Sequence, residues 1–163
     1  MNTERPVDFL TLEHAARFTD AVKQIGTIAL NDEPYGSAVY LLTVSPTVWN
    51  KATRHITEER INFQAMIEES YVSTGESIAI RTAGNLYNGC LEVNPVEFTR
   101  LDSKLFKGVI NAIRLRRDEL LLKEIKLLYE IYSRESEETE LDQSSSMGAY
   151  PEDTKFYYPR GEE

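Results

Sequence analysis

STGESIAIRTAGNLYNG, residues 73–89, carries both the start and the stop signal of one helix. Ser73 and Glu76 have the spacing of a capping box, in which each side chain bonds a free backbone amide of the first turn. Asn88-Gly89 is typical of a helix end, where glycine adopts a left-handed conformation. The residues between them that repeat at helical spacing are apolar: Ile78, Ala79, Ala83 and Leu86. The stretch therefore predicts a well-bounded amphipathic helix.

Helical patterns also precede this stretch. Thr11 is a suitable N-cap for a first helix, and Ser45 for a short helix through Trp49. Residues 38–44 form an apolar run that fits a strand or a buried helix, and we favour the helix because the next cap follows directly. Residues 57–67 predict a further helix with acidic residues near its start.

The longest helical pattern follows an extended connection over residues 90–100. Asp102 is its N-cap, and one apolar stripe is expected to face the core: Leu105, Phe106, Val109, Ile110 and Ile113. If unbroken to Arg134, this helix has about 32 residues and a length of roughly 48 Å. It must therefore bend near Arg116, or its second half must project and bury its leucines on something else.

These patterns predict an all-α protein with a compact multi-helix domain (residues 1–117), a helix extension (118–134) and an acidic, partly disordered tail (135–163). The chain has a formal charge of −9. Nine acidic and two basic residues give the tail −7, which leaves −2 for residues 1–134. We therefore expect no direct binding of nucleic acid, and the natural partner of the tail is a protein with a basic surface.

Several classes of protein are not expected. No apolar run approaches the roughly 18 residues that span a membrane. Cys90 is the only cysteine, so an internal disulfide is excluded and a cytoplasmic location is expected. His14, His55 and Cys90 do not have the spacing of metal ligands, and no phosphate-binding loop or nucleophile elbow is present. We predict no metal, no cofactor and no catalytic residue, although His55 beside Glu58 and Glu59 could form a general base.

One group of polar residues is a candidate ligand site. Arg81, Asn85 and Asn88 share one side of the predicted helix of residues 73–89, and Arg114 lies on the longest helix. Carboxamides donate and accept hydrogen bonds, and arginine binds carboxylates or phosphates. Asn85 and Asn88 could equally cap the helix end, and Arg114 could pair with an internal glutamate.

The sequence resembles a family of small proteins, without an assigned activity, from Gram-positive bacteria and their phages and mobile elements. The resemblance covers about residues 9–117 and includes AGNLYNG (83–89), whose NLYNG block, residues 85–89, is the most specific part. It extends to FLTLEH (9–14), Tyr40-Leu41-Leu42 and AIRLR (112–116). It implies a mostly helical domain in a mobile-element setting.

The function that we expect is therefore a non-enzymatic interaction protein of a phage or mobile element, such as an inhibitor of a host defence nuclease that acts by acidic charge complementarity. The alternatives are a helical assembly protein that dimerises through residues 118–134, and a small-ligand-binding or hydrolytic protein that uses the arginine and asparagine cluster. The residues expected to bind a partner are apolar on the extension and acidic or aromatic in the tail: Leu121, Ile125, Leu128, Tyr132, Glu137, Glu138, Glu140, Asp142, Tyr157 and Tyr158.

Overall fold

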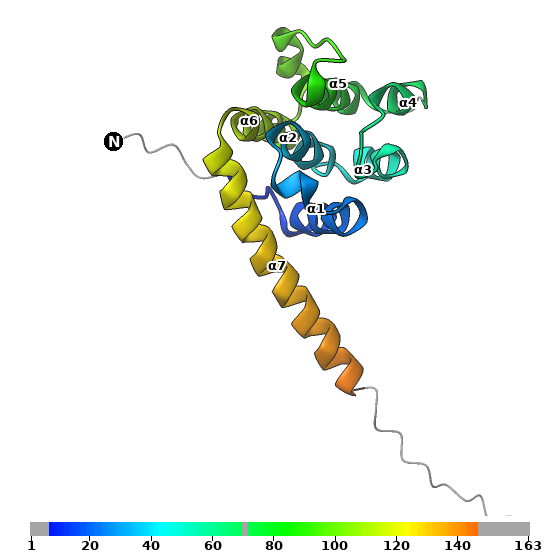
Figure 1. Ribbon diagram of the computed structural model, residues 1–163. Helices are drawn as coiled ribbons and strands as arrows, with labels where there is room; N and C mark the ends of the chain where they lie inside the picture. Colours follow the sequence, from blue (N-terminus) through cyan, green and yellow to red (C-terminus); the bar gives the residue numbers. More distant parts are fainter. Residues whose placement is uncertain (1–6, 70–71, 147–163) are drawn as a thin grey trace, which may run out of the picture.

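The computed structural model describes residues 7–69 and 72–146, and over these it confirms the all-α fold (Figure 1). In chain order the elements are α1 (Leu12–Ile25), η1 (Thr27–Leu30), α2 (Glu33–Leu42), α3 (Pro46–Ala52), η2 (Thr53–His55), α4 (Phe63–Glu68), α5 (Thr74–Asn88), η3 (Pro95–Arg100), α6 (Ser103–Arg117) and α7 (Glu119–Ser146). Within the described ranges, extended chain pairs only in an isolated bridge between Ile56 and Ile61.

Helix α2 is the centre of the fold. Every residue from Tyr35 to Leu42 is buried, and α2 packs against both α5 and α6, with α1 on another side (Figure 1). A helix that is apolar on all sides is stable only when it is surrounded by other elements. The preference for a buried helix over a strand at residues 38–44 is therefore confirmed.

Side-chain caps begin the helices where the sequence places them. Thr11, Ser45, Ser73 and Asp102 each accept a hydrogen bond from the amide three residues on. The capping box of α5 is complete, and Gly89 ends this helix at a left-handed φ of 72°. Each such cap contributes about 1 kcal/mol, so local sequence determines these boundaries directly.

Two segments differ from the sequence prediction. The helix expected from residue 57 begins only at Phe63, because Thr57 and Arg60 close a turn in which Thr57 N donates to Arg60 O at 3.0 Å. Residues 90–100 are not wholly extended, because Asn94 and Glu97 form a second capping box that starts η3. In both places a polar side chain near the segment start selects the local structure.

Helix α6 faces the core with a different stripe from the one predicted. Its buried residues are Leu105, Gly108, Val109, Ala112 and Leu115. Phe106, Ile110 and Ile113 are exposed instead. At Gly108 an added Cβ would lie 2.9 Å from Val44 Cγ2, so α6 approaches the end of α2 more closely than a larger side chain allows. The small residues therefore define the buried face of α6.

The long helix is broken at Asp118, which has extended backbone (φ −133°, ψ 108°). Helix α7 starts at Glu119 and packs its first half against α1, η1, α2 and α6. Leu122 and Ile125 are buried there. Four further side chains of α7 are partly buried against the core: Leu121, Leu128, Tyr129 and Tyr132. The apolar stripe predicted to bind a partner thus packs on its own domain.

The structure places residues 135–146, for which disorder was expected, in helix α7, which ends at Ser146. Glu137, Glu138 and Glu140 are exposed on this helix, and Asp142 lies in it. The predicted partner residues Tyr157 and Tyr158 lie outside the described residues. In Figure 1 the second half of α7 extends well beyond the rest of the domain.

Candidate functional site

Arg81 and Asn85 lie together, but each is engaged within the domain. Arg81 makes a bidentate ion pair with Glu97, with Nη1 and Nη2 at 2.9 and 2.8 Å from the two carboxylate oxygens. This hydrogen-bonded pairing lowers the pKa of Glu97 to about 2 and raises that of Arg81. Asn85 Nδ2 donates to Leu91 O at 2.9 Å. Arg81 and Asn85 therefore hold two later parts of the chain against α5: the segment directly after this helix, and η3.

Asn88 and Arg114 lie elsewhere. Asn88 Oδ1 accepts from Cys90 N at 3.0 Å, which is a local turn contact beyond the helix end. Arg81 and Asn85 line one shallow pocket, Asn88 lines a second, and Arg114 lines a third. The structure does not bring the four predicted ligand residues to one pocket, so the arrangement gives no support to a shared ligand site.

The two histidines have structural contacts. His14 is buried: Nδ1 accepts from Leu10 N at 3.2 Å, and Nε2 lies 3.0 Å from Tyr40 O, which it bonds as a donor. Burial lowers the pKa of His14 to about 3, so the neutral ring ties the segment before α1 to α2. His55 Nε2 lies 2.8 Å from Glu69 Oε1, not beside Glu58 or Glu59. That distance suits an ion pair, but the contact lacks the angle of a hydrogen bond.

The burial of His14 predicts a pH-dependent stability. Its pKa is about 6.5 when unfolded and about 3 when folded, so between these values only the unfolded chain binds the proton. Stability should fall as the pH drops below 6.5, by up to about 1.4 kcal/mol per pH unit. Urea unfolding of the wild type and of His14→Gln between about pH 7.5 and 5.5 tests this, since only the wild type has this contribution. Parallel stability curves would contradict it.

Metal and thiol chemistry receive no support from the described residues. No group of three or more metal-binding side chains lies together in residues 7–69 and 72–146. Cys90 as a whole residue is exposed, but its Sγ is partly buried and lies 3.6 Å from Gly84 O. This partial burial raises the pKa of the thiol. A raised pKa reduces the thiolate fraction and hence the reactivity of the thiol.

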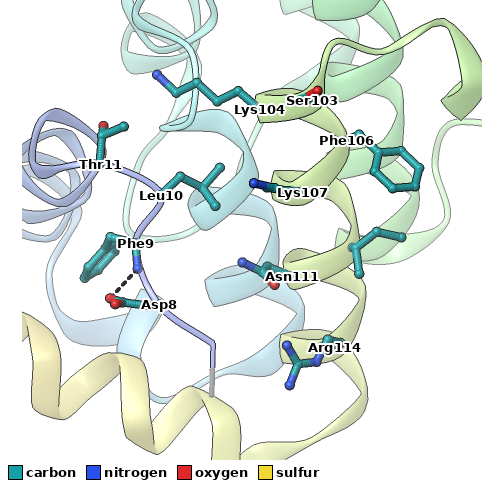
Figure 2. Close-up of a pocket in the computed structure, with 11 residues that line it drawn as sticks. Asp8, Phe9, Leu10, Thr11, Ser103, Lys104, Phe106, Lys107, Asn111 and Arg114 are labelled. Carbon is teal, nitrogen blue, oxygen red and sulfur yellow. Dashed lines mark hydrogen bonds between the residues drawn. The ribbon is translucent and has the colours of Figure 1, made fainter. Parts of the chain in front are cut away.

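A groove of about 690 Å³ lies between α6 and the segment before α1 (Figure 2). Among the described residues, three cationic side chains line it, those of Lys104, Lys107 and Arg114, together with a single carboxylate, that of Asp8. Exposed Phe106 adds an apolar side chain. The groove can accept an anionic group beside an apolar one, and the described part of its lining holds no pair of reactive side chains that would indicate catalysis. The sequence does not reveal this groove, because helical spacing places Phe106 in the predicted core stripe.

The outer surface of α7 is the other feature available for contact. We define the acidic arm as residues 133–146 of α7. Its glutamates, Glu135, Glu137, Glu138 and Glu140, are exposed, and Arg134 is its one basic residue. The arm thus presents a strongly negative helix that projects from a nearly neutral domain.

Comparison of the chain with protein-family models, with curated proteins and with solved structures gives no match. The resemblance to a mobile-element family is therefore an untested expectation. Among the described residues, no helix has both the length and the apolar character needed to cross a membrane.

Proposed function

We propose that this chain is a non-enzymatic interaction protein whose acidic arm binds a protein with a basic surface. The observation that supports the proposal is the projection of the arm from the domain (Figure 1). Its glutamates, Glu135, Glu137, Glu138 and Glu140, are all exposed. Charge complementarity of this kind speeds association and selects partners of the opposite charge. The pairing of Arg81 with Glu97 and the burial of His14 mean that neither side chain is available as a catalytic group.

The more specific form of the proposal is inhibition of a host defence nuclease. A nuclease binds the phosphate backbone through a positively charged surface. A helix about 10–12 Å across, with carboxylates on several sides, can occupy such a surface and exclude the nucleic acid. This form draws on the resemblance to proteins of phages and mobile elements, in addition to the charge of the arm.

The experiment is a neutralisation of the arm. A quadruple variant, E135Q/E137Q/E138Q/E140Q, keeps the length and helix propensity of the arm but removes its charge. The matched control, D20N/E59Q/E68Q/E92Q, neutralises four exposed acidic side chains on the domain. Because exposed charge pairs contribute about 0.2–1 kcal/mol each, the arm variant should bind its partner roughly tenfold to a hundredfold more weakly.

Partner capture from the native host and surface plasmon resonance with the purified partner provide the measurement. Binding by the wild type and by the control should fall as salt is raised, and the arm variant should show a smaller salt dependence. A partner bound equally by all three chains, or a partner with an acidic surface, would refute the charge-complementarity proposal. For the nuclease form, the added readout is protection of the nucleic acid from cleavage.

A further inference from the structure

The groove beside α6 brings exposed apolar side chains together with lysines (Figure 2). Phe106 and Ile110 are 43% and 39% exposed and lie one helical turn apart. Lys104 and Lys107 line the same groove, and neither has an ion pair with another residue in the described part of the chain. The surface is therefore complementary to a segment that carries both acidic and aromatic side chains.

Residues 150–158 of the same chain, YPEDTKFYY, have this composition. They contain the acidic pair Glu152-Asp153 and, after two further residues, the aromatic run FYY (156–158). This run is the only place in the sequence where three aromatic residues follow one another. The segment comes after α7 and lies outside the described residues. Its acids and aromatics are the chemical counterpart of the lysines and apolar side chains of the groove.

We infer that residues 150–158 bind in the groove of their own chain, with the acidic pair beside the two lysines and the aromatic run against the exposed apolar side chains of α6. The charges agree in both signs. Three cations and one carboxylate, that of Asp8, are among the described residues that line the groove, and the segment has two carboxylates and one cation, Lys155. Packing of aromatic rings on Phe106 removes apolar surface from water, which adds to the attraction between the charges.

The chain is long enough for this contact. The ring centroids of Phe9, which lines the groove, and of Tyr132 of α7 lie 5.8 Å apart, so this edge of the groove lies beside α7. From Tyr132 to Ser146 the helix extends for about 21 Å. An extended chain covers about 20 Å over the six residues 147–152, which is enough to bring Glu152 back to the groove.

The segment also matches the groove in length. Residues 152–158 span up to about 20 Å when extended. The wall that α6 contributes, from Lys104 to Arg114, is about 15 Å long. The acidic pair and the aromatic run can therefore both lie within the groove.

Other parts of the chain fit the groove less well. Residues 1–6 contain one acidic residue, one basic residue and no aromatic residue. The acidic arm is helical and extends beyond the domain (Figure 1), and its sequence has no aromatic residue. Residues 150–158 combine the required charge, aromatic character and reach.

Chymotrypsin cleavage of the full chain tests the contact, because the aromatic run contains cleavage sites and a bound segment is cut slowly. The variant K104E/K107E leaves these sites unchanged but repels the acidic pair, so cleavage there should become about threefold to tenfold faster. The matched control, K23E/R60E, reverses two exposed cations outside the groove and should be cut at the wild-type rate. Mass spectrometry identifies the cut, and circular dichroism checks that each fold is intact.

A charge exchange examines the pairing of lysines with acids. E152K/D153K should also be cut faster than the wild type. The combined variant, K104E/K107E/E152K/D153K, restores opposite charges and should be cut more slowly than K104E/K107E. Any effect of the new lysines on the protease itself is measured by E152K/D153K alone.

A further pair of variants examines the apolar contact. F106A/I110A removes the apolar wall and should also speed cleavage at the aromatic run about threefold or more. L120A/L127A removes two exposed leucines of α7 and should leave the rate unchanged. All four side chains are exposed, so these truncations should preserve the fold.

Equal cleavage of the wild type, K104E/K107E and F106A/I110A overturns the inference. Cleavage that slows as the protein concentration is raised from about 1 to 100 μM assigns the groove to the segment of a second copy, and so overturns the contact within one chain. Groove variants that lose an outside partner without any change in cleavage assign the groove to that partner instead. The acidic arm is unchanged in every variant, so failure of this inference is distinguishable from failure of the proposed function.

Discussion

Gly36→Ala should destabilise the fold by about 3 kcal/mol or more. An added Cβ at this position would lie 2.5 Å from Ala29 O and 2.7 Å from Leu122 Cδ1. The backbone oxygen belongs to η1, which is held by α1, α2 and α7, so it has no room to retreat. Glycine to alanine inside a helix ordinarily stabilises by up to about 1 kcal/mol, so a large loss would identify the close contact as the cause.

Gly84→Ala is the matched control for this prediction. Its Cβ would lie 2.7 Å from Leu91 Cδ1, a leucine side chain that is half-buried in the connection after α5. Because that side chain can shift to another rotamer, the loss should be smaller than at Gly36. Urea unfolding of both variants provides the comparison. Equal losses of unfolding free energy in the two variants would mean that the backbone of η1 moves as easily as the Leu91 side chain does.

Ile125→Ala has the second-largest expected effect, a loss of about 2–5 kcal/mol. Ile125 is fully buried where α7 packs on the domain, so its truncation leaves a cavity between them. Leu127→Ala, two residues further along, removes a similar volume from the exposed side and should change stability by less than about 0.5 kcal/mol. Urea unfolding of both variants provides the measurement.

The comparison also tests the placement of α7. If the helix after Asp118 were an independent extension, both truncations would be tolerated equally. A loss confined to Ile125→Ala would establish that the first half of α7 is part of the domain, as its contacts with α1, η1, α2 and α6 indicate.

Local features of this fold could be predicted from the sequence, and features that depend on distant residues could not. The caps at Thr11, Ser73 and Asp102 act within three residues, so their spacing is enough to place a helix start. The pairing of Arg81 with Glu97 depends on how the chain returns after α5, and no local pattern specifies it.

Which apolar side of a helix faces the core could be predicted least well. Helix α7 has apolar side chains on two sides, so spacing alone does not say whether Leu121 or Leu120 faces the core. The buried face of α6 includes Gly108 and Ala112. Because these residues are only weakly hydrophobic, the spacing of apolar residues does not identify this face. Close helix packing, not hydrophobicity, decides that face, and it becomes visible only when α2 is in place.

The exposed end of α7 has a consequence for how firmly it is ordered. Residues 134–141 are exposed, and an isolated helix of this length is marginal in water, so its helical state depends on the anchored turns before Tyr132. Amide hydrogen exchange should therefore be slow around Ile125 and become progressively faster toward Ser146. A protein that binds this end would slow exchange there first, and the retardation would report contact without any knowledge of what the partner is.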